Sequence, residues 1–115
     1  NRLMINRNED YDALFFNNKS VILLIDPLTG KIEDANPAAC TFYGYSCKQI
    51  TRMRIQQINT LPEEVVVDKM RIAFQNSPAH FEFKHRLANG TIKDVNVYSG
   101  VIKFKGKELL YSIIH

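Results

Sequence analysis

The stretch Ile32–Ser46 reads IEDANPAACTFYGYS, and its order of residue types predicts the end of a strand, then a short helix, then the start of a second helix. Asn36 is a strong N-cap type, because its side-chain oxygen can accept a hydrogen bond from a free amide of the first turn. Pro37 suits the first helical position, and Gly44 is a typical helix stop. Ser46 can then cap the second helix.

Two short strands are expected before this helix. Val21–Ile25 is a continuous apolar run rich in β-branched residues, as in a strand buried on both faces. The residues Asp26–Gly30 read DPLTG, a turn sequence in which the glycine can take a positive φ. The segment Lys31–Ala35 is therefore expected to pair back on the first strand as a hairpin.

The longest helix is expected after a stretch of short helical turns between Ile50 and Ile58. It starts near Leu61, with Thr60 as a plausible cap and Pro62 in the first turn, and it ends at Asn76. Its broad apolar stripe consists of Val65, Val66, Lys69, Met70, Ile72, Ala73 and Phe74.

The last third of the chain is expected to be strand. Residues from Phe81 to Leu87 alternate between apolar and charged, and an Asn-Gly turn precedes a second alternating run, Val95–Val101. Lys105–Lys107 then makes a hairpin into Leu109–Ile114. The whole pattern predicts an α+β fold, with a five-stranded antiparallel sheet and short helices plus one longer helix on one face.

The first residues are expected to form a leader helix over residues 1–18, followed by one domain over residues 19–115. Acidic residues after Asn8 favour a helix start, and Tyr11, Leu14 and Phe15 recur at helical spacing. This apolar stripe needs a partner, either the sheet of its own chain or a second copy of the chain.

Composition narrows the function classes. The chain has 115 residues, 45% of them hydrophobic, which suffices for one core. Its net charge is only +3 and no basic stripe is visible, which disfavours nucleic acid as a partner. No apolar run is long enough to span a bilayer, so direct membrane contact is not expected. Two cysteines without a framework favour a reducing, cytoplasmic location, and a start at Asn1 suggests a piece of a longer protein.

Several motifs in this order resemble the PAS domain family. They are Asn36-Pro37-Ala38-Ala39 followed by Gly44-Tyr45-Ser46, the turn with Asp26, Gly30 and Ile32, and the strand with Phe81, His85-Arg86 and Asn89-Gly90. The resemblance covers nearly the whole chain, from about Phe16 to Ile114.

The resemblance implies a sensory or signal-relay domain of a larger prokaryotic signalling protein, such as a sensor histidine kinase of a two-component system or a cyclic-dinucleotide enzyme. Such a domain is not an enzyme itself. It would bind a small ligand, form a homodimer through its leader helix and sheet face, or do both, and would thereby regulate an output domain in the parent chain. The alternative is a ligand-free dimerisation or docking module with a filled core.

The family binds haem, flavin, small metabolites or nothing, and two of these are disfavoured here. The long helix contains no histidine for a haem iron, and Arg52–Asn59 lacks the cysteine that LOV-type flavin photoreceptors use. Cys40 is better explained as a small core residue. No nucleophile motif, P-loop or metal-ligand spacing is present, which leaves a small metabolite or no cofactor.

A mostly apolar pocket between sheet and helices is the expected ligand site. Its expected lining is Tyr43, Phe74, Phe83, His85, Val97, Ser99 and Tyr111. His85 shares the parity of Phe81 and Phe83, and it either points into this pocket or is hydrogen-bonded within the core or at a packed outer face. The two parities of the Val95–Val101 strand leave open which set faces inward.

Overall fold

The computed structural model describes residue 15 and residues 18–115 of the chain. The leader helix expected over residues 1–18 therefore lies outside the described residues, apart from Phe15 and Asn18. No helix of the described part has the length and apolar character needed to cross a membrane.

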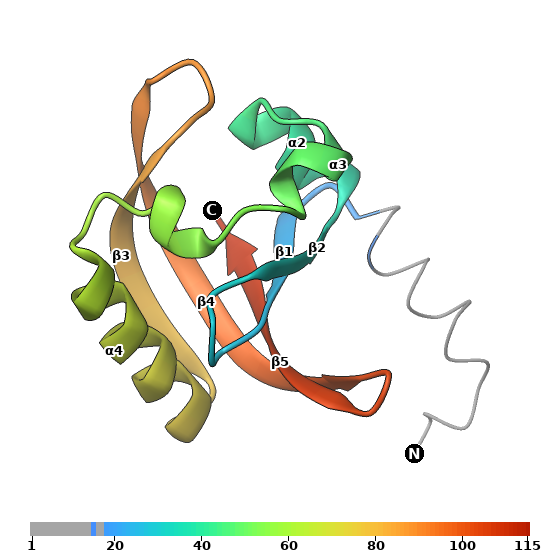
Figure 1. Cartoon of the computed structure of the whole chain (residues 1–115), viewed down its shortest axis with the longest axis vertical. Coiled ribbons are helices and arrows are strands. Elements are labelled where there is room, and N and C mark those ends of the chain that lie inside the picture. Colours follow the sequence, from blue (N-terminus) through green and yellow to red (C-terminus); the bar gives the residue numbers. More distant parts are fainter. Residues whose placement is uncertain (1–14, 16–17) are drawn as a thin grey trace.

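Five antiparallel strands form one sheet with the order β2-β1-β5-β4-β3 (Figure 1). The strands are β1 (Val21–Ile25), β2 (Ile32–Ala35), β3 (Ala79–Arg86), β4 (Ile92–Phe104) and β5 (Lys107–Ile114). The expected five-stranded sheet is thus confirmed. Because β5 pairs with both β1 and β4, the last strand lies in the middle of the sheet and joins the first hairpin to the β3–β4 hairpin.

The helices cover one face of this sheet (Figure 1). They are α2 (Pro37–Tyr43), α3 (Cys47–Ile50), the 3₁₀ turn η2 (Ile55–Gln57) and α4 (Glu63–Gln75). The expected signals at the first two helices are confirmed: α2 ends at Gly44, which has a φ of 83°, and Ser46 caps α3.

Asn36 does more than cap α2. Its side-chain oxygen accepts hydrogen bonds from the amides of Ala39 and Ile22, each at 3.0 Å, and its amide group donates to the carbonyl of Ser20 at 2.7 Å. The side chain is fully buried. One residue therefore fixes the start of α2 against the start of β1.

The start of α4 differs from the sequence-based expectation. Pro62, not Thr60, is the N-cap residue, and Glu63 and Glu64 occupy the first turn near the positive end of the helix dipole. The amide of Thr60 instead donates to the carbonyl of Lys84 at 3.0 Å. Thr60 is thus part of the pairing between the linker before α4 and strand β3.

Apolar side chains pack on both faces of β1, which explains its continuous apolar sequence. Leu23 and Ile25 belong to the main core between sheet and helices. The alternate residues Ile22 and Leu24 lie on the outer face, where they pack with Leu109 and with Phe15, which is only 2% exposed. Phe15 therefore covers part of the outer face of the sheet.

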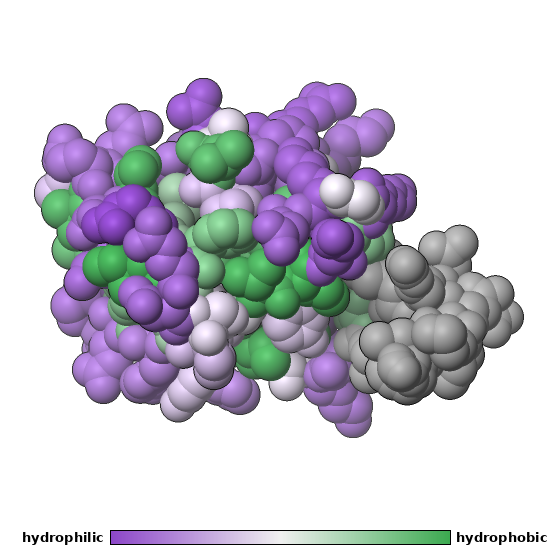
Figure 2. All heavy atoms as spheres, turned by 90° about the horizontal axis from the view of Figure 1, so that it is seen from below, coloured by the Kyte–Doolittle hydropathy of each residue, from purple (hydrophilic) through white to green (hydrophobic). Residues whose placement is uncertain are grey.

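A recess lined by both apolar and charged residues lies at the end of the molecule that carries the β1–β2 turn. Leu28 is 88% exposed there, and Val67 and Phe74 of α4 line the same recess. Figure 2 looks at this end and shows apolar atoms gathered in the middle with polar side chains around them. The recess is open to solvent and separate from the core pocket.

Candidate ligand pocket

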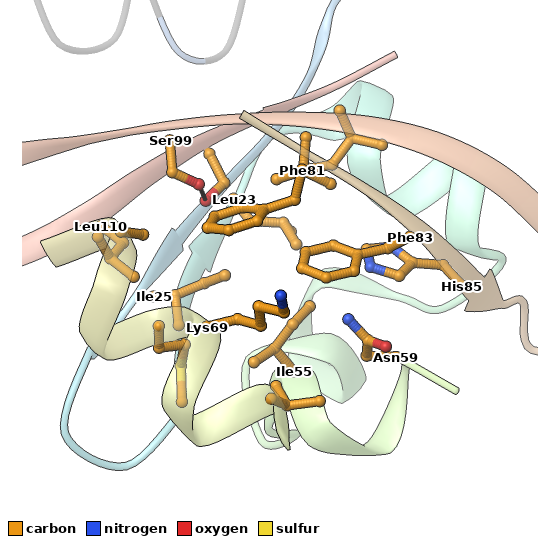
Figure 3. A pocket seen from close by; sticks show the side chains of 16 residues that line it. Leu23, Ile25, Ile55, Asn59, Lys69, Phe81, Phe83, His85, Ser99 and Leu110 are labelled. Atoms are coloured by element: carbon orange, nitrogen blue, oxygen red, sulfur yellow. Dashed lines mark hydrogen bonds between the residues drawn. The ribbon is translucent and has the colours of Figure 1, made fainter. Parts of the chain in front are cut away.

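A pocket lies between the inner face of the sheet and helix α4 (Figure 3). Most of its lining is apolar, and the polar exceptions are Asn59, Lys69, His85, Ser99 and Ser112. The free space is about 40 Å³ as measured for the centres of water-sized molecules. Since one water needs about 10–15 Å³ on this measure, the pocket has room for a few heavy atoms.

Four of the residues expected to line the pocket do so: Phe83, His85, Val97 and Ser99. The parity of β3 brings the first two to the inner face. On β4, Val95, Val97 and Ser99 are buried whereas Tyr98 is 46% exposed, which resolves the parity that the sequence left open.

The other three expected residues lie elsewhere. Tyr111 is on the outer face, packed against the Phe15 cluster, because its neighbours Leu110 and Ser112 have the inward parity of β5. Phe74 is on the side of α4 that lines the surface recess. Tyr43 does not line the pocket, but its hydroxyl is hydrogen-bonded to His85, which does.

Three polar lining residues, Asn59, Lys69 and Ser112, were not among the expected set. Asn59 pairs with His85 in an isolated antiparallel bridge, which places their side chains on the same side. Lys69 projects from α4, with its Nζ 5.8 Å from the centre of the Phe81 ring. The position of Lys69 within the apolar stripe of this helix was the available signal, whereas nothing in the sequence pointed to Asn59.

The hydrogen bond between the Tyr43 hydroxyl and Nδ1 of His85 decides what the pocket presents. The two atoms are 2.8 Å apart, and both side chains are almost completely buried. Among the described residues the hydroxyl has no other acceptor, so it donates to Nδ1. The proton of the neutral imidazole then sits on Nε2, which is buried and has no partner of its own.

Burial keeps both members of this pair neutral. It lowers the pKa of His85 to about 4 and raises the pKa of Tyr43. An imidazolium or a phenolate would lose its hydration in this environment without gaining an opposite charge. At neutral pH the pair is therefore a neutral hydrogen-bonded unit.

The two serines of the lining satisfy each other. Ser99 of β4 and Ser112 of β5 are register partners, and their hydroxyl oxygens are 2.9 Å apart. Both are buried. They add polarity to the pocket wall, where one hydroxyl donates to the other and the second hydroxyl keeps its own proton to donate.

The contacts of Cys40 and Asp26 indicate structural roles for both residues. Burial and the neighbouring Cys47 thiol raise the pKa of Cys40 to about 12, so its thiol is protonated and a poor nucleophile. The Asp26 carboxylate accepts a hydrogen bond from the Leu28 amide at 2.8 Å and forms an ion pair with the Lys107 ammonium group at 3.0 Å. Residues 15 and 18–115 contain no group of three or more potential metal ligands.

Comparison with known proteins identifies relatives of this arrangement. A family model for the PAS domain matches residues 18–115. The diguanylate cyclase DgcM of Escherichia coli is 35% identical over 107 residues, which cover 91% of this chain and 26% of that protein. The chain thus spans about a quarter of the length of this curated relative.

Solved structures show the same fold at low sequence identity. The PAS domain of an HTR-like protein from Haloarcula marismortui has a TM-score of 0.83 and 19% identity, covering 99% of this chain and 94% of its own. A second structure is the PAS domain of a LuxR-family transcriptional regulator from Burkholderia thailandensis in complex with ethanol. It has a TM-score of 0.70 and 13% identity, and the match covers 90% of this chain and 95% of that chain.

The buried neutral histidine predicts an acid-sensitive fold. Between pH 6.5 and about 4 the unfolded chain binds a proton at His85 that the folded chain does not, so stability falls as the pH falls through this window. We expect a loss on the order of 3 kcal/mol in the free energy of unfolding across it. Urea unfolding at a series of pH values measures this slope.

The control is His85→Gln, which cannot take up the proton. This variant is less stable at pH 7, but its stability should change much less between pH 6.5 and 4. An equal slope in both proteins would contradict the assignment of a neutral His85.

Proposed function

Because the chain belongs to the PAS domain family, we propose that it senses a small ligand in the pocket under α4 and relays the occupied state to an output domain of a longer protein. The observation that carries the proposal is the partnerless Nε2 of His85, held inside a mostly apolar pocket. An unmade hydrogen bond of a buried donor costs about 1–3 kcal/mol, which a ligand with an acceptor atom would return.

We infer that the parent protein is a cyclic-dinucleotide enzyme. The support is the 35% identity to the diguanylate cyclase DgcM, a protein of which this chain matches about a quarter. The sensor-kinase alternative rests on likeness of fold alone. In the proposed parent, the cyclase activity belongs to the output domain and the cytoplasm is the location, which suits the two free cysteines.

Precedent for a small ligand comes from the Burkholderia thailandensis relative, whose PAS domain was solved with ethanol. A molecule of that size suits a pocket with room for a few heavy atoms. Larger cofactors would require α4 to move away from the sheet.

Strand β5 provides a route from the pocket to the segment before β1. Leu110 lines the pocket, whereas the adjacent Leu109 packs against Phe15 on the outer face. A ligand that shifts β5 would change both contacts together. Such a shift has to be driven by differential affinity, at about 1.4 kcal/mol for each tenfold change in population.

A second candidate function is dimerisation through the outer face of the sheet. Four residues there are fully buried or nearly so, and Ile102, Phe104, Tyr111 and Ile113 are half-buried around them. We propose a homodimer in which the leader segment and this face of one chain meet those of a second chain. This homodimer would act together with ligand binding or, if side chains permanently fill the pocket, in place of it.

The ligand proposal predicts that filling the pocket abolishes ligand-induced stabilisation. Ala73 of α4 is 2% exposed and lines the pocket, so Ala73→Leu should occupy the free space. We expect some members of a panel of short-chain alcohols, amides and carboxylates to raise the melting temperature of the wild type but not of this variant. Differential scanning fluorimetry gives the measurement.

The matched control is Val67→Leu, on the same helix at a residue that is 43% exposed. The melting temperature of this variant should rise with the same compounds as that of the wild type. A panel that stabilises no protein, or that stabilises the Ala73→Leu variant equally, would contradict the ligand proposal.

The dimer proposal predicts that Phe15→Glu weakens self-association, because it places a charge in the apolar cluster on the outer face. Multi-angle light scattering should give a dimer mass for the wild type and a lower mass for this variant. Leu28→Glu, at an 88% exposed position that does not belong to this cluster, should leave the mass unchanged. A monomeric wild type would exclude the dimer.

A further inference from the structure

The polar groups at the His85 end of the pocket are donors rather than acceptors. His85 offers its Nε2–H, as the hydrogen bond from Tyr43 requires. Its side chain is only 2% exposed, so bulk water does not compensate for this donor. A ligand that fits here must therefore bring an acceptor to the position in front of Nε2.

Asn59 adds a second donor. Its side-chain oxygen already accepts a hydrogen bond from the Leu61 amide at 3.0 Å, which fixes the orientation of the side-chain amide. The structure gives the NH₂ group no acceptor among the described residues. Because Asn59 and His85 are bridge partners flanked by two backbone hydrogen bonds, their side chains are close neighbours.

Lys69 adds a positive charge. Its ammonium group lies near the Phe81 ring, and among the described residues no carboxylate pairs with it. Figure 3 shows its side chain extending from α4 toward the same part of the pocket as Asn59 and His85. None of the residues that line the pocket is acidic.

Building on the proposed function, we propose that the ligand is a small aliphatic monocarboxylate. Its carboxylate takes the hydrogen bonds of His85 and Asn59 and the charge of Lys69, while its short chain lies toward Ile25 and Leu110. Figure 3 shows these two apolar side chains on the opposite side of the pocket from Asn59 and His85. The free space of about 40 Å³ favours chains of a few carbon atoms.

The test compares butyrate with butyramide, a neutral molecule of nearly the same shape. Isothermal titration calorimetry at pH 7 should show tighter binding of butyrate to the wild type. Lys69→Met should weaken butyrate about tenfold, the equivalent of one charge-assisted hydrogen bond, and leave butyramide unchanged. Lys48→Met, at an exposed lysine on α3, should change neither affinity.

A second variant addresses the donor set itself. Asn59→Asp keeps the oxygen that accepts from the Leu61 amide but replaces the NH₂ donor with an anionic oxygen, so it should abolish butyrate binding at the concentrations used. Circular dichroism confirms that each variant is folded.

The outcomes separate this inference from the function on which it rests. If butyramide binds as tightly as butyrate and Lys69→Met changes nothing, the carboxylate assignment is overturned while a small-ligand sensor still stands. If neither compound nor any of the short-chain alcohols binds to the wild type, both fail.

Discussion

The buried hydrogen bond between Tyr43 and His85 is the contact on which the ligand site depends. It joins the end of α2 to β3, an edge strand of the sheet. The carbonyl of Tyr43 also accepts from the Ala88 amide at 2.8 Å, and Asn36 ties the other end of α2 to β1. Helix α2 is thus held at both ends across the inner face of the sheet.

This one contact also sets the chemistry of the pocket. A tyrosine hydroxyl buried with a single possible acceptor must donate, which places the imidazole proton on the pocket side. The fold thereby buries the Nε2–H donor of His85 without a hydrogen-bond partner. This costs a free energy comparable to that of a lost hydrogen bond. The free energy of ligand binding can include the recovery of this cost, so a polar defect in the empty state becomes a recognition element in the occupied one.

The sequence predicted most of the architecture because local signals specified it. The N-cap at Asn36, the helix stop at Gly44 and the strand alternation of β3 and β4 each involve residues close in the chain. The pocket was harder. Strand parity correctly grouped Phe83 with His85, but Asn59 enters through an isolated bridge to β3, a long-range contact with no local signature. Tyr111 was expected on the inner face because an apolar strand buried on both faces carries no alternation to read.

The most direct test of this account is the protonation state of His85, observed through two-bond ¹H–¹⁵N correlation spectra of the imidazole ring in ¹⁵N-labelled protein at pH 7. The account predicts a neutral ring with the proton on Nε2 and an unprotonated Nδ1 that accepts from Tyr43. A proton on Nδ1 would contradict it, because Nε2 would then be an acceptor and His85 would no longer offer a donor to the ligand.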